Sequence, residues 1–267
     1  MKKQLFLTLI LTAAAASADN RRFTYTYEPE TEPRGDWEVE QSVTSRAGRT
    51  AAVGQKDFQA WEFRTEIEHG FTERYTAALY FNDQFTHYID PANGWRVNDN
   101  RWAGLSVENR YLILDPRDHT IGLTLYLEPT YTGKNAELEQ KIILGQRFGN
   151  WKWALNLTHA TEWQNDFRSR EGELEISAGL ARQLTPRWAL ALELRDHNEL
   201  PDYREWQNTA LYLGPTLSYH RQKWWTAFSV MPQICGVNFS DNPDANQHLE
   251  LEGHERVNFR LLVGFSF

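Results

Sequence analysis

Hydrophobic and polar residues alternate along most of the chain, and the last twelve residues show this most clearly. In residues 256–267, six apolar side chains occupy every second position, with Asn258, Arg260, Gly264 and Ser266 between them. Strict period two predicts a strand with one apolar face and one polar face. Such an apolar face packs either on a protein core or against lipid, and the rest of the chain decides between the two.

The same alternation recurs about twelve times along the chain. Each predicted strand has nearly the length that a tilted strand needs to cross a bilayer. The helical period of 3.6 is not found in any stretch. The predicted strands are 36–43, 58–69, 74–82, 101–114, 120–131, 137–148, 151–163, 171–184, 188–195, 209–220, 223–235 and 255–267.

The connections between these strands alternate in length. Short ones such as 148–150 and 221–222 alternate with long ones such as 85–100, 196–207 and 236–254, and the short 132–136 is the exception on the long side. Alternating short and long loops are typical of an up-and-down barrel with tight periplasmic turns and exposed outer loops. An even number of strands places both termini on the periplasmic side.

One face of the predicted strands is apolar and uncharged, and aromatic residues gather at strand ends beside the turns. Phe71, Trp151, Trp188 and Phe265 are examples. This is the placement of an interfacial aromatic girdle. A soluble sandwich also alternates, but it lacks the girdle and the two-sided loop lengths. The pattern predicts an all-β fold: a single up-and-down antiparallel transmembrane β-barrel of about 12 strands.

The start of the chain indicates the compartment. Lys2 and Lys3 precede a short apolar run, and Ala16-Ser17-Ala18 precedes Asp19, which is the pattern of a cleaved secretory signal. We therefore expect a signal peptide at 1–18, a polar periplasmic segment at 19–35, and a barrel at 36–267 in the bacterial outer membrane, in contact with its lipid.

Composition narrows the possible partners. The formal charge is −8 and becomes −10 when Lys2 and Lys3 leave with the signal peptide. Nucleic acid is an unfavourable partner for so acidic a chain. A single cysteine, Cys235, excludes an internal disulfide. No cofactor is implied.

Two resemblances support this interpretation. The final strand is similar to the C-terminal signal of outer-membrane proteins that the barrel-assembly machinery recognises, with Phe259, Leu261, Val263, Phe265 and Phe267 at the matching places. Residues 25–48 and 58–82 resemble the start of a family of uncharacterised Gram-negative barrels, some described as transporters or as relatives of a phenol-degradation pathway protein. That resemblance implies fold and location, and it implies no ligand or catalytic residue.

The polar face of the strands is charged and predicts a channel for small polar solutes. Thirteen acidic and seven basic candidates on this face favour a weak preference for cations. The alternative is that oppositely charged side chains pair across a narrow lumen and close it. The candidates for the lumen wall are Glu62, Arg64, Glu66, Glu108, Arg110, Glu128, Glu137, Glu139, Lys141, Glu173, Glu175, Glu193, Arg195 and Arg260.

Two other functions stay open. A lipid hydrolase needs a serine beside an oriented histidine, for which Ser218 with His220, or His159 with Thr161 and Glu162, are the only candidate groups, and neither has the motif of known barrel hydrolases. A structural or adhesive role would act through the aromatic loop residues Trp95, Tyr203 and Trp206. The stretch 241–246 contains Asp241 and Asp244 but does not match a calcium loop, so we interpret it as a solvated surface loop and predict no metal site.

Overall fold

The protein is described by a computed structural model, which covers residues 21–50, 54–203, 205–239 and 248–267. These residues form twelve β-strands, and they contain no helix that is long and apolar enough to cross a membrane. The strands are β1 (Trp37–Ala47), β2 (Lys56–Thr72), β3 (Tyr75–Ile89), β4 (Arg96–Leu114), β5 (Gly122–Tyr131), β6 (Ala136–Phe148), β7 (Trp151–Gln164), β8 (Ser169–Gln183), β9 (Trp188–Pro201), β10 (Asn208–His220), β11 (Trp224–Asn238) and β12 (Val257–Ser266).

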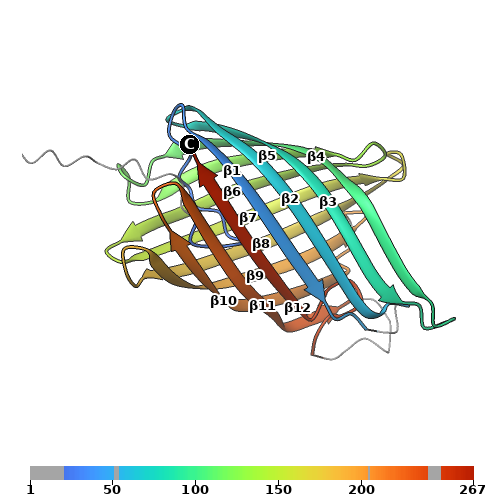
Figure 1. Cartoon of the computed structure of the whole chain (residues 1–267). Helices are drawn as coiled ribbons and strands as arrows, with labels where there is room; N and C mark the ends of the chain where they lie inside the picture. The colour runs from blue at the N-terminus through green and yellow to red at the C-terminus, as the bar shows by residue number, and fades with distance from the viewer. Residues whose placement is uncertain (1–20, 51–53, 204, 240–247) are drawn as a thin grey trace, which may run out of the picture.

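The strands close into one antiparallel barrel (Figure 1). Each strand pairs with its neighbours in sequence, and β12 pairs with β1 from Ser266 opposite Glu38 to Val257 opposite Ala47. The Phe267 backbone N–H donates to the Trp37 carbonyl over 2.9 Å, which fastens the end of the chain beside β1. The predicted all-β, twelve-stranded, up-and-down barrel is therefore confirmed.

The barrel has two different ends. The short-turn end carries the connections 73–74, 115–121, 149–150, 184–187 and 221–223, together with Phe267. The long-loop end carries the connections between β1 and β2, β3 and β4, β5 and β6, β7 and β8, β9 and β10, and β11 and β12, of which 51–53, 204 and 240–247 lie outside the described residues.

Several strands are longer at the long-loop end than the alternation predicts. Residues 85–100 were expected to be a loop, but β3 continues to Ile89 and β4 begins at Arg96. Likewise, β9 continues to Pro201 through the expected loop 196–207. Backbone pairing there continues beyond the point where apolar and polar side chains stop alternating, so the sequence pattern ends before the strand does.

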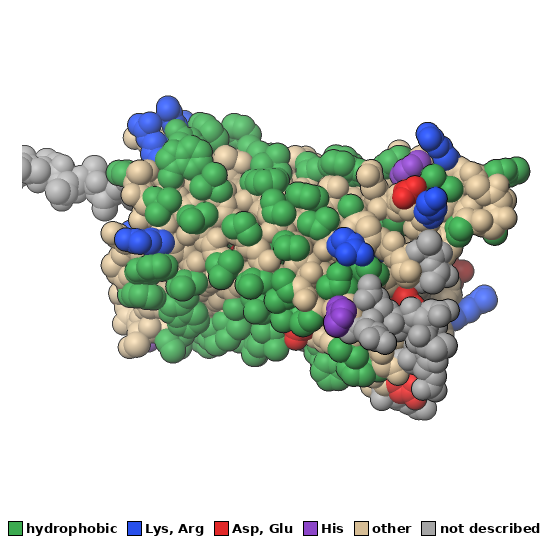
Figure 2. Space-filling view, turned by 90° about the horizontal axis from the view of Figure 1, so that it is seen from below, with side chains coloured by type: hydrophobic (Ala, Val, Ile, Leu, Met, Phe, Trp, Pro, Cys, Tyr) green, Lys and Arg blue, Asp and Glu red, His purple; other side chains and the backbone are tan. Residues whose placement is uncertain are grey.

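The outer surface is a broad apolar band (Figure 2). Leu125 and Leu192 on this surface are 47% and 52% exposed, as are other large apolar side chains of the same face. Charged side chains in the same view gather toward the two ends of the barrel. A band of this kind is stable against hydrocarbon and unfavourable against water, which matches the predicted lipid face.

The segment before β1 differs from expectation. Residues 19–35 were predicted to lie in the periplasm, but the described part from Arg21 to Glu32 lies inside the barrel (Figure 1). Phe23, Thr24 and Thr26 are completely buried there. We call residues 21–32 the lumen segment. The barrel interior is therefore filled partly by the chain's own N-terminal residues.

Candidate functional site

The lumen segment adds no strand to the sheet, so its backbone has no ladder of hydrogen bonds. Polar side chains of the barrel wall hold it instead. The Glu193 carboxylate on β9 accepts hydrogen bonds from the backbone N–H groups of Thr24, Tyr25 and Thr26 at 2.7, 2.9 and 3.1 Å. Asn156 on β7 accepts from the Tyr27 N–H at 2.6 Å and donates to its carbonyl at 2.9 Å. These wall side chains replace the ladder partners that buried backbone groups need.

The apolar side chains of the segment fill recesses in the wall. Phe23 packs against Ala154, Ala181 and Ala191. A Cβ at position 179 would lie 2.4 Å from the Phe23 ring, so only glycine leaves enough space for the ring there. Small residues on three neighbouring strands thus form a pocket with the shape of one aromatic ring.

Two tyrosines of the segment contact opposite parts of the wall. Tyr27 packs edge-on against Tyr126, with ring centroids 5.3 Å apart. Tyr25 packs against Tyr212 and its neighbours Ala210 and Met231. The segment therefore extends across the barrel interior from β10 and β11 toward β5.

The two ends of the lumen segment are fixed near the short-turn end. Arg21 pairs with Glu40 on β1 at 3.4 Å, and Arg22 contacts the His220 ring on β10 at 2.7 Å. At the other end, the Glu32 N–H donates to the Thr76 hydroxyl at 3.0 Å. These contacts place the segment in the half of the barrel that adjoins the short turns.

A cavity of about 340 Å³ lies on the long-loop side of the segment, with Tyr25 and Tyr27 among its lining residues. The charges of its lining nearly balance. The acidic residues are Glu62, Asp83, Glu128, Glu137, Glu139 and Glu175, and the basic residues are Arg46, Arg64, Lys141, Arg195 and Arg260. Six acidic against five basic residues is a smaller acidic excess than the thirteen against seven that the sequence suggested.

Ion pairs organise the cavity wall. Arg46 pairs with Glu62 at 2.8 Å. Lys141 pairs with Glu139 at 2.7 Å, and Arg195 pairs with Glu175 at 2.6 Å. Arg64 on β2 contacts Glu128 on β5, and the same glutamate contacts Tyr126. The wall thus presents alternating positive and negative groups in fixed positions. These pairs do not fill the whole lumen, because the cavity remains beside them.

The predicted lumen residues fall into four groups. Nine line the cavity: Glu62, Arg64, Glu128, Glu137, Glu139, Lys141, Glu175, Arg195 and Arg260. Glu66, Glu108 and Arg110 form a buried cluster with Glu68, in which Arg110 pairs with Glu108 at 2.7 Å. Glu193 holds the lumen segment, and Glu173 contacts His197 at 3.1 Å. Arg110 pairs with two of the three carboxylates, Glu68 and Glu108, and we assign no metal ion to this cluster.

Sequence reasoning missed the lumen segment itself. Phe23, Tyr25 and Tyr27 alternate with Thr24 and Thr26, which is a short period-two pattern. The prolines and glutamates that follow argued against a strand, and the segment is indeed not a strand. Three aromatic side chains at alternate positions were nevertheless a signal that this stretch packs against protein.

The residues of the predicted assembly signal lie on the outer face of β12. Phe259, Leu261 and Phe265 are well exposed there, and Phe267 follows the strand with 69% of its surface exposed. Val263 shares this face between them. Recognition by the barrel-assembly machinery remains a prediction.

The candidate hydrolase groups lack a catalytic arrangement. The Ser218 hydroxyl lies 3.1 Å from His220 Nε2, but both side chains are buried inside the barrel. The Arg22 guanidinium also contacts both nitrogens of that ring, at 3.1 and 2.7 Å, and a cation there opposes the proton uptake of a general base.

The second candidate group is also dispersed. His159 and Thr161 lie on the outer side of β7 beside Tyr203, and Tyr203 donates to the Thr161 hydroxyl. Glu162 is on the inner side of the same strand and contacts Gln164 at 3.1 Å. The strand alternation therefore separates Glu162 from His159.

Loop aromatics differ in their surroundings. Trp95 is 74% exposed at the tip between β3 and β4. Trp206 donates from Nε1 to Asn198 at 3.2 Å, so it lies against the barrel. The stretch 241–246, with Asp241 and Asp244, lies outside the described residues.

The loop before β12 folds over part of the long-loop end. We call residues 248–256 the mouth loop. The Glu250 carboxylate accepts from the backbone N–H groups of Glu252, Gly253 and His254 at 3.0–3.2 Å. Burial raises the pKa of Glu255, but Arg46 and Arg49 lower it more, so the net pKa is below that of an ordinary glutamate. Charge pairing thus holds this loop in place.

Comparisons with known proteins agree with this architecture. The sequence profile of a family of unknown function (DUF6662) matches residues 15–144 and 145–267. The comparison with curated proteins finds no match.

Several solved structures share the fold. The COG4313 outer membrane channel from Pseudomonas putida F1 has a TM-score of 0.59 and 14% identity, over 89% of this chain and 97% of that chain. A KdgM porin has a TM-score of 0.54 and 10% identity, over 86% and 99%. A NanC porin has a TM-score of 0.51 and 13% identity, over 86% and 98%. At these identities the likeness shows the fold alone.

Proposed function

We propose that this chain, which belongs to the DUF6662 family of unknown function, is an outer-membrane channel for small polar solutes whose lumen segment restricts passage. The observation that carries the proposal is the charged cavity of about 340 Å³ with Tyr25 and Tyr27 of that segment in its lining. Structural similarity to outer-membrane channels and porins supports it. Such barrels place short turns in the periplasm and long loops outside.

The cavity favours polar solutes, because its wall consists mainly of charged and amide side chains. Solutes that carry both donors and acceptors gain hydrogen bonds from the alternating charges. The small acidic excess gives a weak preference for cations. We therefore expect lower cation selectivity than an unpaired ring of carboxylates would produce.

Passage requires displacement of the lumen segment. Its contacts to the wall are made by side chains and not by a β-ladder, so they can break without opening the barrel. The barrel wall has its own complete strand pairing. This separation of a rigid wall from an internal segment is what a gated channel needs.

The test is single-channel current in a planar bilayer under a salt gradient, with wild type compared with deletion of residues 21–32. A second variant replaces these residues with Gly and Ser, which keeps the length and removes the side-chain contacts. We expect both variants to conduct at least several-fold more than wild type, with a weakly cation-selective reversal potential. Heat-modifiable migration on gels confirms that each barrel is folded.

A folded barrel that carries no current either with or without residues 21–32 is not a channel. If wild type and both variants show equal, stable conductance, the barrel is a channel, but the lumen segment does not restrict passage through it.

A further inference from the structure

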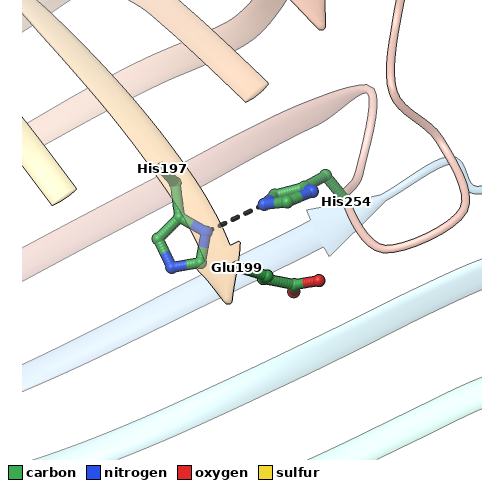
Figure 3. A group of neighbouring side chains, drawn as sticks. All are labelled: His197, Glu199 and His254. Atoms are coloured by element: carbon green, nitrogen blue, oxygen red, sulfur yellow. Dashed lines mark hydrogen bonds between the residues drawn. The ribbon is translucent and has the colours of Figure 1, made fainter. Parts of the chain in front are cut away.

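Two histidines and a glutamate meet at the long-loop end, away from the lumen segment (Figure 3). His197 and Glu199 are two residues apart on β9 and therefore share its inner side. His254 comes from the mouth loop. One potential ligand atom from each of the three residues lies within 4.8 Å of the others.

The hydrogen bonds around the rings determine where their protons lie. His197 Nε2 is 3.1 Å from the Glu173 carboxylate, and His254 Nδ1 is 2.7 Å from the Glu250 carboxylate. Ionised carboxylates only accept, so each ring donates its N–H outward to its carboxylate. The remaining nitrogens, His197 Nδ1 and His254 Nε2, face each other over 2.8 Å.

In the neutral rings, these facing nitrogens both carry lone pairs. Two lone pairs at 2.8 Å repel, and a cation between them removes the repulsion. A histidine that ligates a metal usually donates its other N–H to a carboxylate, which fixes the tautomer and the ring orientation. Both rings here have that arrangement, through two different carboxylates.

We propose that His197, His254 and Glu199 bind a divalent first-row transition-metal ion such as Zn²⁺. Two imidazoles and one carboxylate are a common protein ligand set for zinc, with the fourth position open to water. Asn208 donates to the Glu199 carboxylate at 2.6 Å and orients it. Imidazole ligands favour zinc, copper and nickel over magnesium or calcium.

The distance between the two histidine nitrogens needs only a small adjustment. With Zn–N bonds of about 2.0–2.1 Å, two nitrogens of a tetrahedral centre lie roughly 3.3 Å apart, so the pair must open by about 0.5 Å. His254 is on a loop and can make that shift. The side chains of His197 and His254 are 12% and 5% exposed, so water competes weakly for the ion.

Metal binding would tie the mouth loop to β9. Among the described residues, this loop is otherwise fastened by the Arg49–Glu255 pair and by hydrogen bonds such as Gln233 to the Glu250 carbonyl. The inference does not depend on the proposed channel, because binding is measured without current. A barrel can bind the ion whether or not it conducts.

The experiment is calorimetric titration of untagged, refolded protein with ZnCl₂ at neutral pH, with the Co²⁺ visible spectrum as an independent readout. All proteins carry Cys235→Ser, because that cysteine is exposed and binds soft metals. We expect one equivalent of Zn²⁺, with affinity reduced at least tenfold by His254→Gln, His197→Gln or Glu199→Gln. Glu173→Gln, which leaves all three ligands, should reduce affinity by about tenfold.

His87→Gln is the matched control. His87 is a half-buried histidine in the same long-loop region, in contact with Asn98 at 2.8 Å. The proposal fails if no stoichiometric binding occurs, which would mean that a proton alone bridges the two rings. It also fails if His87→Gln lowers affinity as much as His254→Gln does. Gel migration of each variant separates loss of the site from loss of the fold.

Discussion

The two halves of the lumen are built from the same antiparallel wall, but they differ in what their inner residues do. Near the short turns, small residues such as Ala154 and Gly179 leave space that Phe23 fills. Toward the long loops, long charged side chains such as Arg195 and Glu175 pair along the wall and leave a cavity. Side-chain size and pairing, not strand number, therefore determine where this barrel is filled.

Different interactions stabilise the two halves of the lumen. Burial of aromatic rings and hydrogen bonds to fixed carboxylates hold the lumen segment. The cavity wall is held by ion pairs such as Arg46–Glu62 and Arg195–Glu175, which join neighbouring strands that are already paired through their backbones. Mutations in the first half should change opening, and mutations in the second should change selectivity.

The largest effect is expected from Phe23→Ala. The ring is completely buried, and removal of such a ring from a packed site costs about 3–5 kcal/mol. The lumen segment should detach, and mean current should rise at least several-fold toward that of the deletion variant. Phe71→Ala removes a ring that is exposed on the outer side and should leave the current unchanged.

Glu193→Gln should have the next largest effect. The amide keeps one acceptor oxygen, so it loses part of the hydrogen bonding to three backbone N–H groups. Hydrogen bonds to a charged group contribute about 1.5–3 kcal/mol each. Channel openings should become more frequent than in wild type but less frequent than in Phe23→Ala.

Glu171→Gln is the control for that change, because Glu171 is an exposed glutamate at the long-loop end of β8. If Glu193→Gln opens no more often than Glu171→Gln, the hydrogen bonds of Glu193 do not retain the segment.

A smaller effect is expected from Glu139→Gln in the cavity. This change leaves Lys141 without the carboxylate at 2.7 Å and makes the wall more positive by one charge. The reversal potential under a salt gradient should shift toward anions, while opening frequency stays at the wild-type level. A change in opening with no shift in selectivity would contradict the division between the two halves.

The smallest effect is expected from acid on the mouth loop. The lowered pKa of Glu255 means that its contribution to stability is complete above the ordinary glutamate pKa and is lost as the pH falls through the lowered value. Amide hydrogen exchange in residues 249–256, corrected for intrinsic rates, should increase as the pH falls from about 7 to about 3. Unchanged protection over that range would show that Arg46 and Arg49 do not hold the loop through Glu255.

Alternation was sufficient to predict the barrel and its strand number, because lipid on one face forces period two. It could not predict the position of the lumen segment, since Phe23 and Tyr25 contact residues such as Ala191 and Tyr212 that are far away in sequence. It also missed His197, because β9 loses its alternation beyond the apolar band. Contacts between distant segments and strands outside the membrane leave no local pattern.

If the lumen segment restricts passage as proposed, it must leave its site before solute passes. Thr24 and Ser229 test it directly, because their hydroxyl oxygens lie 2.7 Å apart, close to the roughly 2.0 Å of a disulfide bond. Cysteines at both positions, in a Phe23→Ala and Cys235→Ser background, allow the segment to be tethered and released in one protein. We predict that current is suppressed when mass spectrometry shows the disulfide and rises when it is reduced. Equal current in the oxidised and reduced states, or no current in either, would contradict the claim.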